Sequence, residues 1–233
     1  MEIFIDSADP KEIIRWTSCG IADGVTTNPS VMLKDKVFDL EEGSKSIARW
    51  IHPRPLSVEV TTNDLEEMLA QSRRFASWAP NIVIKIPQEN QYGASCYGVM
   101  YQLEKEGIKV NATVAMSFGQ VMLSAKANAS YISIFFGRVG DEGGNPSQVI
   151  SDSIKWLEHW KYKSRIIVGS IRCVADVLQA ANAGAHIITI PPQFIAKMAD
   201  HHYTRATVAQ FMGDAQKALE KMAVAPKVVQ AQA

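Results

Sequence analysis

One lysine near the end of a strongly apolar segment is the first residue of this sequence whose setting suggests chemistry. The segment Ile82–Ile86 has branched aliphatic side chains at four of its five positions, which predicts a β-strand covered on both faces. Pro87 ends the strand because it has no N–H to donate. Apolar surroundings disfavour an ammonium, so a lysine buried at Lys85 could act as a neutral amine that attacks a carbonyl group. A lone strand lysine more commonly reaches solvent or pairs with a carboxylate, so other residues must decide between these interpretations.

Polar side chains also stand at, or just beyond, the ends of most other predicted strands. Each alone fits a helix cap or a turn. Together they favour a functional site, because burying polar groups costs free energy that a barrel built only for stability avoids. The last strand ends in Ile190–Pro192 and is expected to offer no polar group. The candidates, all polar except Phe135, which shares a strand face with Ser133, are Asp6, Thr26, Asn28, Glu59, Lys85, Asn111, Thr113, Ser133, Phe135, Arg138, Ser170 and Arg172.

Short apolar strands alternate with helical patterns along the whole chain. Eight such repeats predict a (β/α)8 barrel, the TIM-barrel fold, in which the carboxyl ends of all strands meet at one mouth. An open doubly wound sheet is the alternative, but it usually has a glycine-rich turn after its first strand, and Ser7–Pro10 contains no glycine. The predicted strands are Ile3–Asp6, Ile21–Thr26, Leu56–Val60, Ile82–Ile86, Ile108–Thr113, Tyr131–Phe136, Arg165–Gly169 and His186–Ile190.

The length of 233 residues fits one large domain. We expect residues 1–225 to form the barrel together with a C-terminal helix over Thr204–Met222. Residues 226–233 show no anchoring pattern and are expected to form a flexible tail. Asn63 is expected to cap the helix after the third strand, and the glycine-rich stretch Gly137–Pro146 is expected to be a loop.

The composition is that of an ordinary globular protein and excludes several classes of partner. Basic and acidic side chains number 24 each, without a basic cluster, so neither nucleic acid nor an anionic membrane is expected. The start of the chain does not read as a signal peptide, and no apolar run approaches the roughly 20 residues that span a bilayer. Cys19, Cys96 and Cys173 are too far apart for zinc spacing, so we expect reduced thiols, no metal and a cytoplasmic location.

The polar strand ends suit amine catalysis on a carbonyl compound. Lys85 would form a Schiff base with a ketone, and the iminium would accept electrons when a neighbouring carbon–carbon bond breaks. Glu59 could take a hydroxyl proton through a water molecule. Arg138, Ser170 and Arg172 follow strands six and seven, where these barrels frequently bind phosphate, and arginine matches phosphate geometry. A barrel that binds sugar phosphates without catalysis is the competing hypothesis from another functional class.

Two segments resemble the motifs of a known family. Gly24–Ser30 reads Gly-Val-Thr-Thr-Asn-Pro-Ser and is similar to the transaldolase signature, and Ile84–Pro87 is similar to that family's Schiff-base lysine segment. The resemblance covers nearly the whole chain, in the compact form shared by small transaldolases and fructose-6-phosphate aldolase. It implies that a dihydroxyacetone unit passes from a ketose phosphate, sedoheptulose 7-phosphate or fructose 6-phosphate, to an aldose phosphate in the pentose phosphate pathway.

The resemblance also implies a role for each candidate residue. Lys85 would carry the Schiff base, Glu59 would be the acid/base acting through a water that Thr113 helps to hold, and Asp6 would assist proton movements. The family uses no metal and no organic cofactor. Its small members form pentamers or decamers, for which the amphipathic helix over Val208–Met222 is a candidate contact. The residues that would bind the substrate are Asn28, Thr26, Asn111, Ser133 and Phe135, with Arg138, Ser170 and Arg172 on its phosphate.

Three positions favour transfer over aldol cleavage. Aldolases of the family have Gln and Tyr where this chain has Glu59 and Phe135, and the segment Asn111–Thr113 resembles the transaldolase form. One loop departs from the family pattern: after Lys-Ile-Pro the family usually has Ser or Thr, an acid and a glycine, whereas Gln88–Gly93 lacks the hydroxyl and is one residue longer. Two alternatives therefore stay open, a fructose-6-phosphate aldolase that releases free dihydroxyacetone and a transaldolase-like enzyme with a different acceptor.

Overall fold

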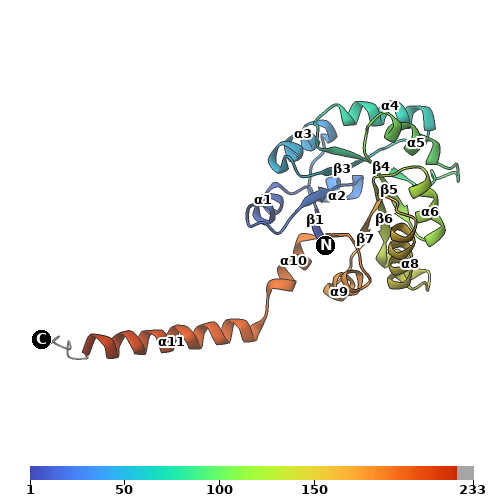
Figure 1. Ribbon diagram of the computed structural model, residues 1–233. Coiled ribbons are helices and arrows are strands. Elements are labelled where there is room, and N and C mark those ends of the chain that lie inside the picture. Colours follow the sequence, from blue (N-terminus) through green and yellow to red (C-terminus); the bar gives the residue numbers. More distant parts are fainter. Residues whose placement is uncertain (225–233) are drawn as a thin grey trace, which may run out of the picture. The chain divides into compact units, whose positions relative to one another are not determined.

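Eight parallel strands form a closed barrel in this computed structural model, which describes residues 1–224 (Figure 1). The strands are β1 (Glu2–Asp6), β2 (Gly24–Thr26), β3 (Leu56–Glu59), β4 (Ile82–Pro87), β5 (Val110–Ala115), β6 (Tyr131–Phe135), β7 (Arg165–Gly169) and β8 (Ile187–Ile190). They follow one another around the barrel in chain order, and β8 closes it by pairing with β1. This topology confirms the predicted (β/α)8 fold.

Helices alternate with the strands along the chain and continue after the last strand (Figure 1). They are α1 (Pro10–Ser18), α2 (Pro29–Lys34), α3 (Leu40–Ile51), α4 (Leu65–Ala76), α5 (Tyr97–Lys105), α6 (Phe118–Lys126), α7 (Phe136–Asp141), α8 (Pro146–His159), α9 (Val174–Asn182), α10 (Pro192–Ala199) and α11 (His202–Val224). Two helices, α2 and α3, stand between β2 and β3, where the sequence patterns predict one helical region.

Several helices begin at a polar residue whose side chain accepts a hydrogen bond from the backbone of the first turn. Asp9 caps α1 and Ser117 caps α6 in this way. The helix after β3 is capped by Asp64, so the prediction that Asn63 caps it is wrong. The amide of Asn63 is placed to bond the loop after β4, where its Oδ1 accepts from the backbone N–H of Gln91 at 3.1 Å.

The stretch after β6 differs from the predicted loop Gly137–Pro146, because its first part is the helix α7. Phe136 and Val139 are buried and anchor this helix against the protein. Packing of these side chains outweighs the low helix propensity of the glycines in the same stretch. Arg138 therefore sits on a helix that directly follows a strand end.

The interior of the barrel is layered from its N-terminal to its C-terminal end. Side chains alternate in direction along a strand, so Glu2, Phe4 and Asp6 of β1 share one face. Phe4 packs with Ile167 and Ile187 in a buried apolar cluster. Asp6 lies on the C-terminal side of this layer, and the polar side chains of the candidate site lie with it.

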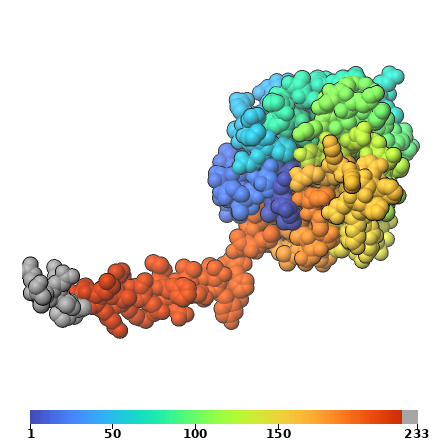
Figure 2. All heavy atoms as spheres, viewed as in Figure 1, coloured from blue at the N-terminus to red at the C-terminus, as the bar shows by residue number. Residues whose placement is uncertain are grey.

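The chain divides into two compact units. The first, Met1–Ile195, contains the barrel, and in Figure 2 the first residues of the chain (blue) lie beside residues near the end of this unit (orange), as the pairing of β1 with β8 requires. The second unit begins at Ala196 and contains α11, whose residues 202–223 are all exposed. Within residues 1–224, no helix is long and apolar enough to cross a membrane. The predicted tail, 226–233, lies outside the described residues, and the domain boundary at residue 225 stays a prediction.

Candidate active site

Three neighbouring strands place a lysine, a glutamate and an asparagine side by side. In the strand register, Lys85 on β4 lies between Glu59 on β3 and Asn111 on β5. The Nζ atom of Lys85 donates a hydrogen bond to the backbone oxygen of Thr27 at 3.0 Å and lies 3.0 Å from Oε2 of Glu59. Two oxygen atoms from two different strand ends therefore hold the amine in place.

This ion pair is shielded from solvent. The side chains of Lys85 and Glu59 are 6% and 19% exposed. Charges attract each other more strongly in such surroundings than in water, but both groups lose hydration, so a buried pair contributes little to stability. Proton transfer explains the Lys85–Glu59 pair better than stability does, because a carboxylate within hydrogen-bond distance of an amine can exchange a proton with it.

A second carboxylate lies near the amine, at the end of β1. Oδ1 of Asp6 accepts a hydrogen bond from the Thr26 hydroxyl at 3.0 Å. Burial raises the pKa of Asp6 above its ordinary value of 3.8, and the charge of Lys85 and the bond from Thr26 oppose this rise only in part. The site thus holds one carboxylate paired with an amine and one that resists ionisation, which suits them to different proton-transfer roles.

The last strand also contributes a polar group, so the prediction that it offers none is wrong. The hydroxyl oxygen of Thr189 on β8 lies 2.5 Å from that of Thr26, and Thr189 lines the candidate site. Thr189 shares its strand face with Ile187 of the apolar interior cluster, two residues earlier. Period-two alternation along this strand is the signal that identifies Thr189, whereas the strand end alone does not.

Asn111 is fully buried, and its amide is bonded at both ends. Its Nδ2 donates to the hydroxyl of Ser57 at 3.2 Å, and its Oδ1 accepts from the hydroxyl of Ser133 at 2.7 Å. These bonds connect β3, β5 and β6 and fix the orientation of Ser133. Ser57 is absent from the predicted set, although its spacing of two residues from Glu59 places both on one strand face.

The end of β5 is irregular beside the site. Its pairing with β6 shifts register between Ala112 and Ala115, and Val114 has a φ of 59°, a conformation that is costly for a β-branched residue. Thr113 is fully buried, and its hydroxyl oxygen has no hydrogen-bond partner within the described residues. Backbone strain and unpaired buried hydroxyls are uncommon in a purely structural core and cluster at functional sites.

Gln88 ties this irregular strand end to its neighbours. Its Nε2 donates to the backbone oxygen of Thr113 at 3.1 Å, and its Oε1 accepts from the hydroxyl of Ser124 on α6 at 2.7 Å. Gln88 is 3% exposed and points into the protein rather than lining the candidate site. The sequence marks Gln88 only as a departure in a loop, because its two partners lie 25 and 36 residues away along the chain.

A cavity of about 410 Å³ opens among these strand ends, within the usual size range for small-molecule sites. Asn28 lies at its edge and caps α2, where its Oδ1 accepts from the backbone N–H of Val31 at 2.9 Å. The side-chain amide nitrogen of Asn28 is left available to a ligand. Seven of the predicted site residues line the cavity: Asp6, Asn28, Glu59, Ser133, Phe135, Arg138 and Ser170.

Four more predicted residues lie directly behind this lining. Three of them are hydrogen-bonded or ion-paired to a lining residue, and the fourth precedes Val114, which lines the cavity itself. They are Lys85, Thr26, Asn111 and Thr113. Among residues 1–224, no group of three or more His, Cys, Asp or Glu side chains is placed to hold a metal ion.

The residues predicted to bind phosphate separate into two groups. Arg138 and Ser170 line the cavity. The backbones beside them lie close together, because the N–H of Gly137 donates to the Ser170 backbone oxygen at 3.1 Å. A Cβ atom on Gly137 would lie 2.6 Å from that oxygen. Arg172 is not part of the cavity lining, and its guanidinium forms a bidentate ion pair with Asp141 at the exposed surface.

Fold and site together define a class of protein, the (β/α)8-barrel enzymes that hold an amine beside a carboxylate at the C-terminal mouth of the barrel. Residues 3–231 match the sequence model of the family "Transaldolase/Fructose-6-phosphate aldolase". The chain belongs to this family, which confirms the resemblance found in its motifs.

Curated relatives agree with this family. A "Probable transaldolase" from Lactiplantibacillus plantarum is 41% identical over 214 residues, which cover 92% of this chain and 96% of the relative. Another of the same name, from Anaeromyxobacter sp. strain Fw109-5, is 39% identical over 218 residues, 93% of this chain and 98% of the relative. Among solved structures, a mandelate oxidase mutant with an FMN adduct has a TM-score of 0.55 at 13% identity, over 82% of this chain and 64% of the oxidase chain, and shows the fold alone.

The raised pKa of Asp6 predicts a stability effect that depends on pH. Folding disfavours the ionised form, so the stability that Asp6 contributes is present below about pH 3.8 and is lost as pH rises through its higher folded-state pKa. We expect Asp6→Asn to raise Tm at pH 7 and to lose this advantage at acid pH. Thermal unfolding across pH, with the exposed helix cap Asp39→Asn as control, measures it. An unchanged or lower Tm of Asp6→Asn at pH 7 would contradict the expectation.

Removing the amide of Gln88 should destabilise the protein and impair the site. Gln88→Leu removes the donor to the Thr113 backbone oxygen, which costs about 1–3 kcal/mol for an unsatisfied buried group, whereas the Ser124 hydroxyl keeps the Gln120 backbone oxygen as an acceptor at 2.8 Å. Gln102→Leu is the matched control, because Gln102 bonds Glu106 only at the surface. Chemical unfolding should separate the two variants clearly, with kcat reduced only for Gln88→Leu. Equal effects of both variants would refute a specific role for Gln88.

Proposed function

We propose that this protein is a transaldolase that moves a dihydroxyacetone unit from a ketose phosphate, sedoheptulose 7-phosphate or fructose 6-phosphate, to an aldose phosphate of the pentose phosphate pathway. One observation carries the proposal: the shielded amine of Lys85 lies 3.0 Å from the Glu59 carboxylate, directly behind the lining of a polar cavity. Family membership and the names of the relatives point to the same reaction.

The reaction begins at the nitrogen of Lys85. Glu59 takes a proton from the ammonium, and the neutral amine attacks the C2 carbonyl carbon of the ketose. The carbinolamine that forms loses water, with its oxygen protonated by a neighbouring acid, and leaves an iminium between Lys85 and C2. Asp6 is suited to supply that proton, because burial raises its pKa and favours the protonated carboxyl. The proton that Glu59 took from Lys85 then passes to Asp6, which leaves Glu59 ionised for the next step.

The iminium then accepts the electrons of the breaking bond. A base removes the proton of the C4 hydroxyl, the C3–C4 bond breaks, an aldose phosphate leaves, and an enamine of dihydroxyacetone stays on Lys85. Glu59 is the base, acting through a water molecule for which the unpaired hydroxyl of Thr113 is an available partner. The same steps in reverse join the enamine to the acceptor aldehyde, and hydrolysis releases the new ketose.

The rest of the cavity orients the sugar. Five side chains line the cavity or support its lining and would contact the hydroxyls and carbon chain of the substrate, namely those of Thr26, Asn28, Asn111, Ser133 and Phe135.

Arg138 and Ser170 would hold the phosphate at the opposite end of the substrate from the reacting carbonyl. The guanidinium of Arg172 would join them by exchanging the carboxylate of Asp141 for the phosphate, since both anions offer it a bidentate partner.

Transfer is favoured over release of free dihydroxyacetone. Glu59 supplies a carboxylate base, and Phe135 has no phenol that could protonate the enamine while it waits for an acceptor. The loop that departs from the family pattern is bonded to the rest of the chain, because Asn90 Nδ2 donates to the backbone oxygen of Asn63 at 2.8 Å. Since this loop follows the reactive strand, a different acceptor is the second candidate within the same mechanism.

Borohydride trapping tests the Schiff base. Incubation with fructose 6-phosphate and borohydride should add a stable mass to the peptide that contains Lys85, because reduction converts the iminium to a secondary amine. Lys85→Met should fold, take up no label and lose turnover. Labelling of another lysine, or no label in the wild type under turnover conditions, would refute the proposed mechanism.

Acceptor dependence then separates transferase from aldolase. Fructose 6-phosphate should be consumed rapidly only when erythrose 4-phosphate is present. Turnover at the same rate without it would assign the aldolase activity instead. A trapped Lys85 adduct with no turnover on erythrose 4-phosphate, but turnover on other aldehydes, would assign a different acceptor.

We further propose a cytoplasmic homo-oligomer, a pentamer or decamer, with α11 as one of its contacts. Within α11, the apolar side chains of Val208, Phe211, Met212, Leu219 and Met222 recur at helical spacing, and each is more than half exposed. A continuous apolar stripe of this kind commonly marks a protein interface.

Charge on the stripe should reduce the assembly size. Phe211→Glu/Met212→Glu places two carboxylates on the stripe, and light scattering after gel filtration should then report a smaller particle. Gln210→Glu, which adds a charge to the opposite face of the same helix, is the control and should keep the wild-type mass. A wild-type monomer, or equal masses for both variants, would contradict the proposal.

A further inference from the structure

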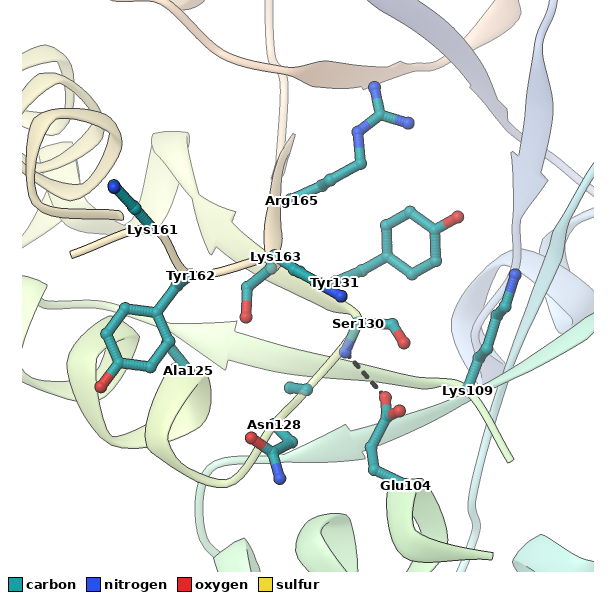
Figure 3. A pocket seen from close by; sticks show the side chains of 12 residues that line it. Glu104, Lys109, Ala125, Asn128, Ser130, Tyr131, Lys161, Tyr162, Lys163 and Arg165 are labelled. Atoms are coloured by element: carbon teal, nitrogen blue, oxygen red, sulfur yellow. Dashed lines mark hydrogen bonds between the residues drawn. The ribbon is translucent and has the colours of Figure 1, made fainter. Parts of the chain in front are cut away.

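A second hollow, of about 540 Å³, lies at the N-terminal end of the barrel, beside the starts of β5, β6 and β7 (Figure 3). We call it the basal hollow. It is larger than the active-site cavity, but it contains no shielded amine paired with a carboxylate. Its residues lie at the opposite strand ends from the proposed reaction, so it is a separate feature.

The basal hollow is strongly cationic in a chain whose formal net charge is zero. Four basic side chains line it against a single carboxylate. Arg165 is paired with Glu2, at 2.8 Å. Lys109, Lys161 and Lys163 form no ion pair with any group in residues 1–224. Unpaired cations gathered in a concavity raise the local potential and attract anions.

The one carboxylate of the basal hollow is already bonded to the backbone. An Oε1 atom of Glu104 accepts from the backbone N–H groups of Val110 and Ser130, both at 2.7 Å, and Figure 3 shows the second bond. These N–H groups belong to the beginning of β5 and the residue before β6. An anion of the protein itself therefore already occupies part of this polar environment, which shows that the strand starts accommodate negative charge.

Neutral donors complete the lining. The hydroxyls of Ser130, Tyr131 and Ser164 make no hydrogen bond to any group of the described chain, although Ser164 is only 7% exposed. Ser130 and Tyr131 are half-buried, so their free hydroxyls are accessible and have capacity for a ligand. Burial raises the pKa of Tyr131 and keeps its hydroxyl protonated as a donor. The ring of Tyr131 packs on the apolar interior cluster, which closes the hollow from within.

We propose that the basal hollow binds a small anion with several negative charges, of the class of pyrophosphates and organic phosphate esters. Figure 3 shows Lys109 and Lys163 on either side of Tyr131 and Ser130, whereas the guanidinium of Arg165 points away. Ammonium groups around hydroxyl donors match the oxygens of a phosphate group. A concave site with basic residues confined to its walls favours a small ligand over nucleic acid, which requires an extended basic surface.

Calorimetric titration with inorganic pyrophosphate, at constant ionic strength, tests this proposal. The titration uses the full chain with the substitution Arg138→Gln, which removes the cation proposed to hold phosphate in the active-site cavity. In this background, Lys109→Gln/Lys163→Gln should weaken binding about tenfold or more, because two charge-assisted bonds are lost. Lys36→Gln/Lys155→Gln removes two exposed lysines that line neither cavity and should change binding by less than about twofold.

Tyr131→Phe, which keeps the ring and removes the hydroxyl, should weaken pyrophosphate binding as well. This variant leaves the charge unchanged, so its effect distinguishes a specific binding site from general electrostatic attraction. Equal weakening by the two lysine pairs would overturn the proposal, because it would show non-specific attraction. Loss of all binding on Arg138→Gln alone would overturn it in favour of the active-site cavity. Binding of a single-stranded oligonucleotide without binding of pyrophosphate would assign the surface to nucleic acid.

Discussion

The close approach of one amine and one carboxylate is the constraint on which the rest of this barrel depends. Lys85 and Glu59 are held 3.0 Å apart although both lose hydration there. The fixed register of neighbouring strands places Glu59 and Lys85 opposite each other, and closure of the barrel removes the free edges that would let the register slip. The bond to the Thr27 backbone oxygen adds a third strand end to the same arrangement.

The apolar interior layer makes it possible for one barrel to have two polar ends. Phe4, Ile167 and Ile187 form a buried apolar layer inside the barrel, and β1, which carries Phe4, has Glu2 on one side of this layer and Asp6 on the other. On β6, the alternation that places Ser133 in the active-site cavity places Tyr131 in the basal hollow, two residues earlier. The charged groups at one end are thus separated from the polar groups at the other by well-packed side chains.

Local sequence patterns were sufficient to predict the fold and most of the residues that line or support the candidate cavity. Apolar runs, helix caps and polar strand ends are local signals, and eleven of the twelve predicted site residues line the cavity or lie directly behind its lining. Arg172 does not line the cavity: its side chain lies beside Gly137, and its guanidinium pairs with Asp141, a partner 31 residues away that no local pattern reveals. Period-two alternation along its strand could have predicted Thr189 as a lining residue. No local pattern predicted α7, which forms where glycines suggest a loop because tertiary packing buries Phe136 and Val139.

The departure after Pro87 has a physical explanation that differs from direct contact with the substrate. Gln88 does not line the cavity, and its amide bonds the end of β5, where Val114 is held in a strained conformation. Such strain persists only where surrounding bonds over-determine the backbone. A residue with a shorter hydroxyl side chain would not span to both the Thr113 backbone oxygen and Ser124. The altered loop therefore acts on the site through the shape of the next strand, and any change in acceptor preference would follow from where Thr113 and Val114 are placed.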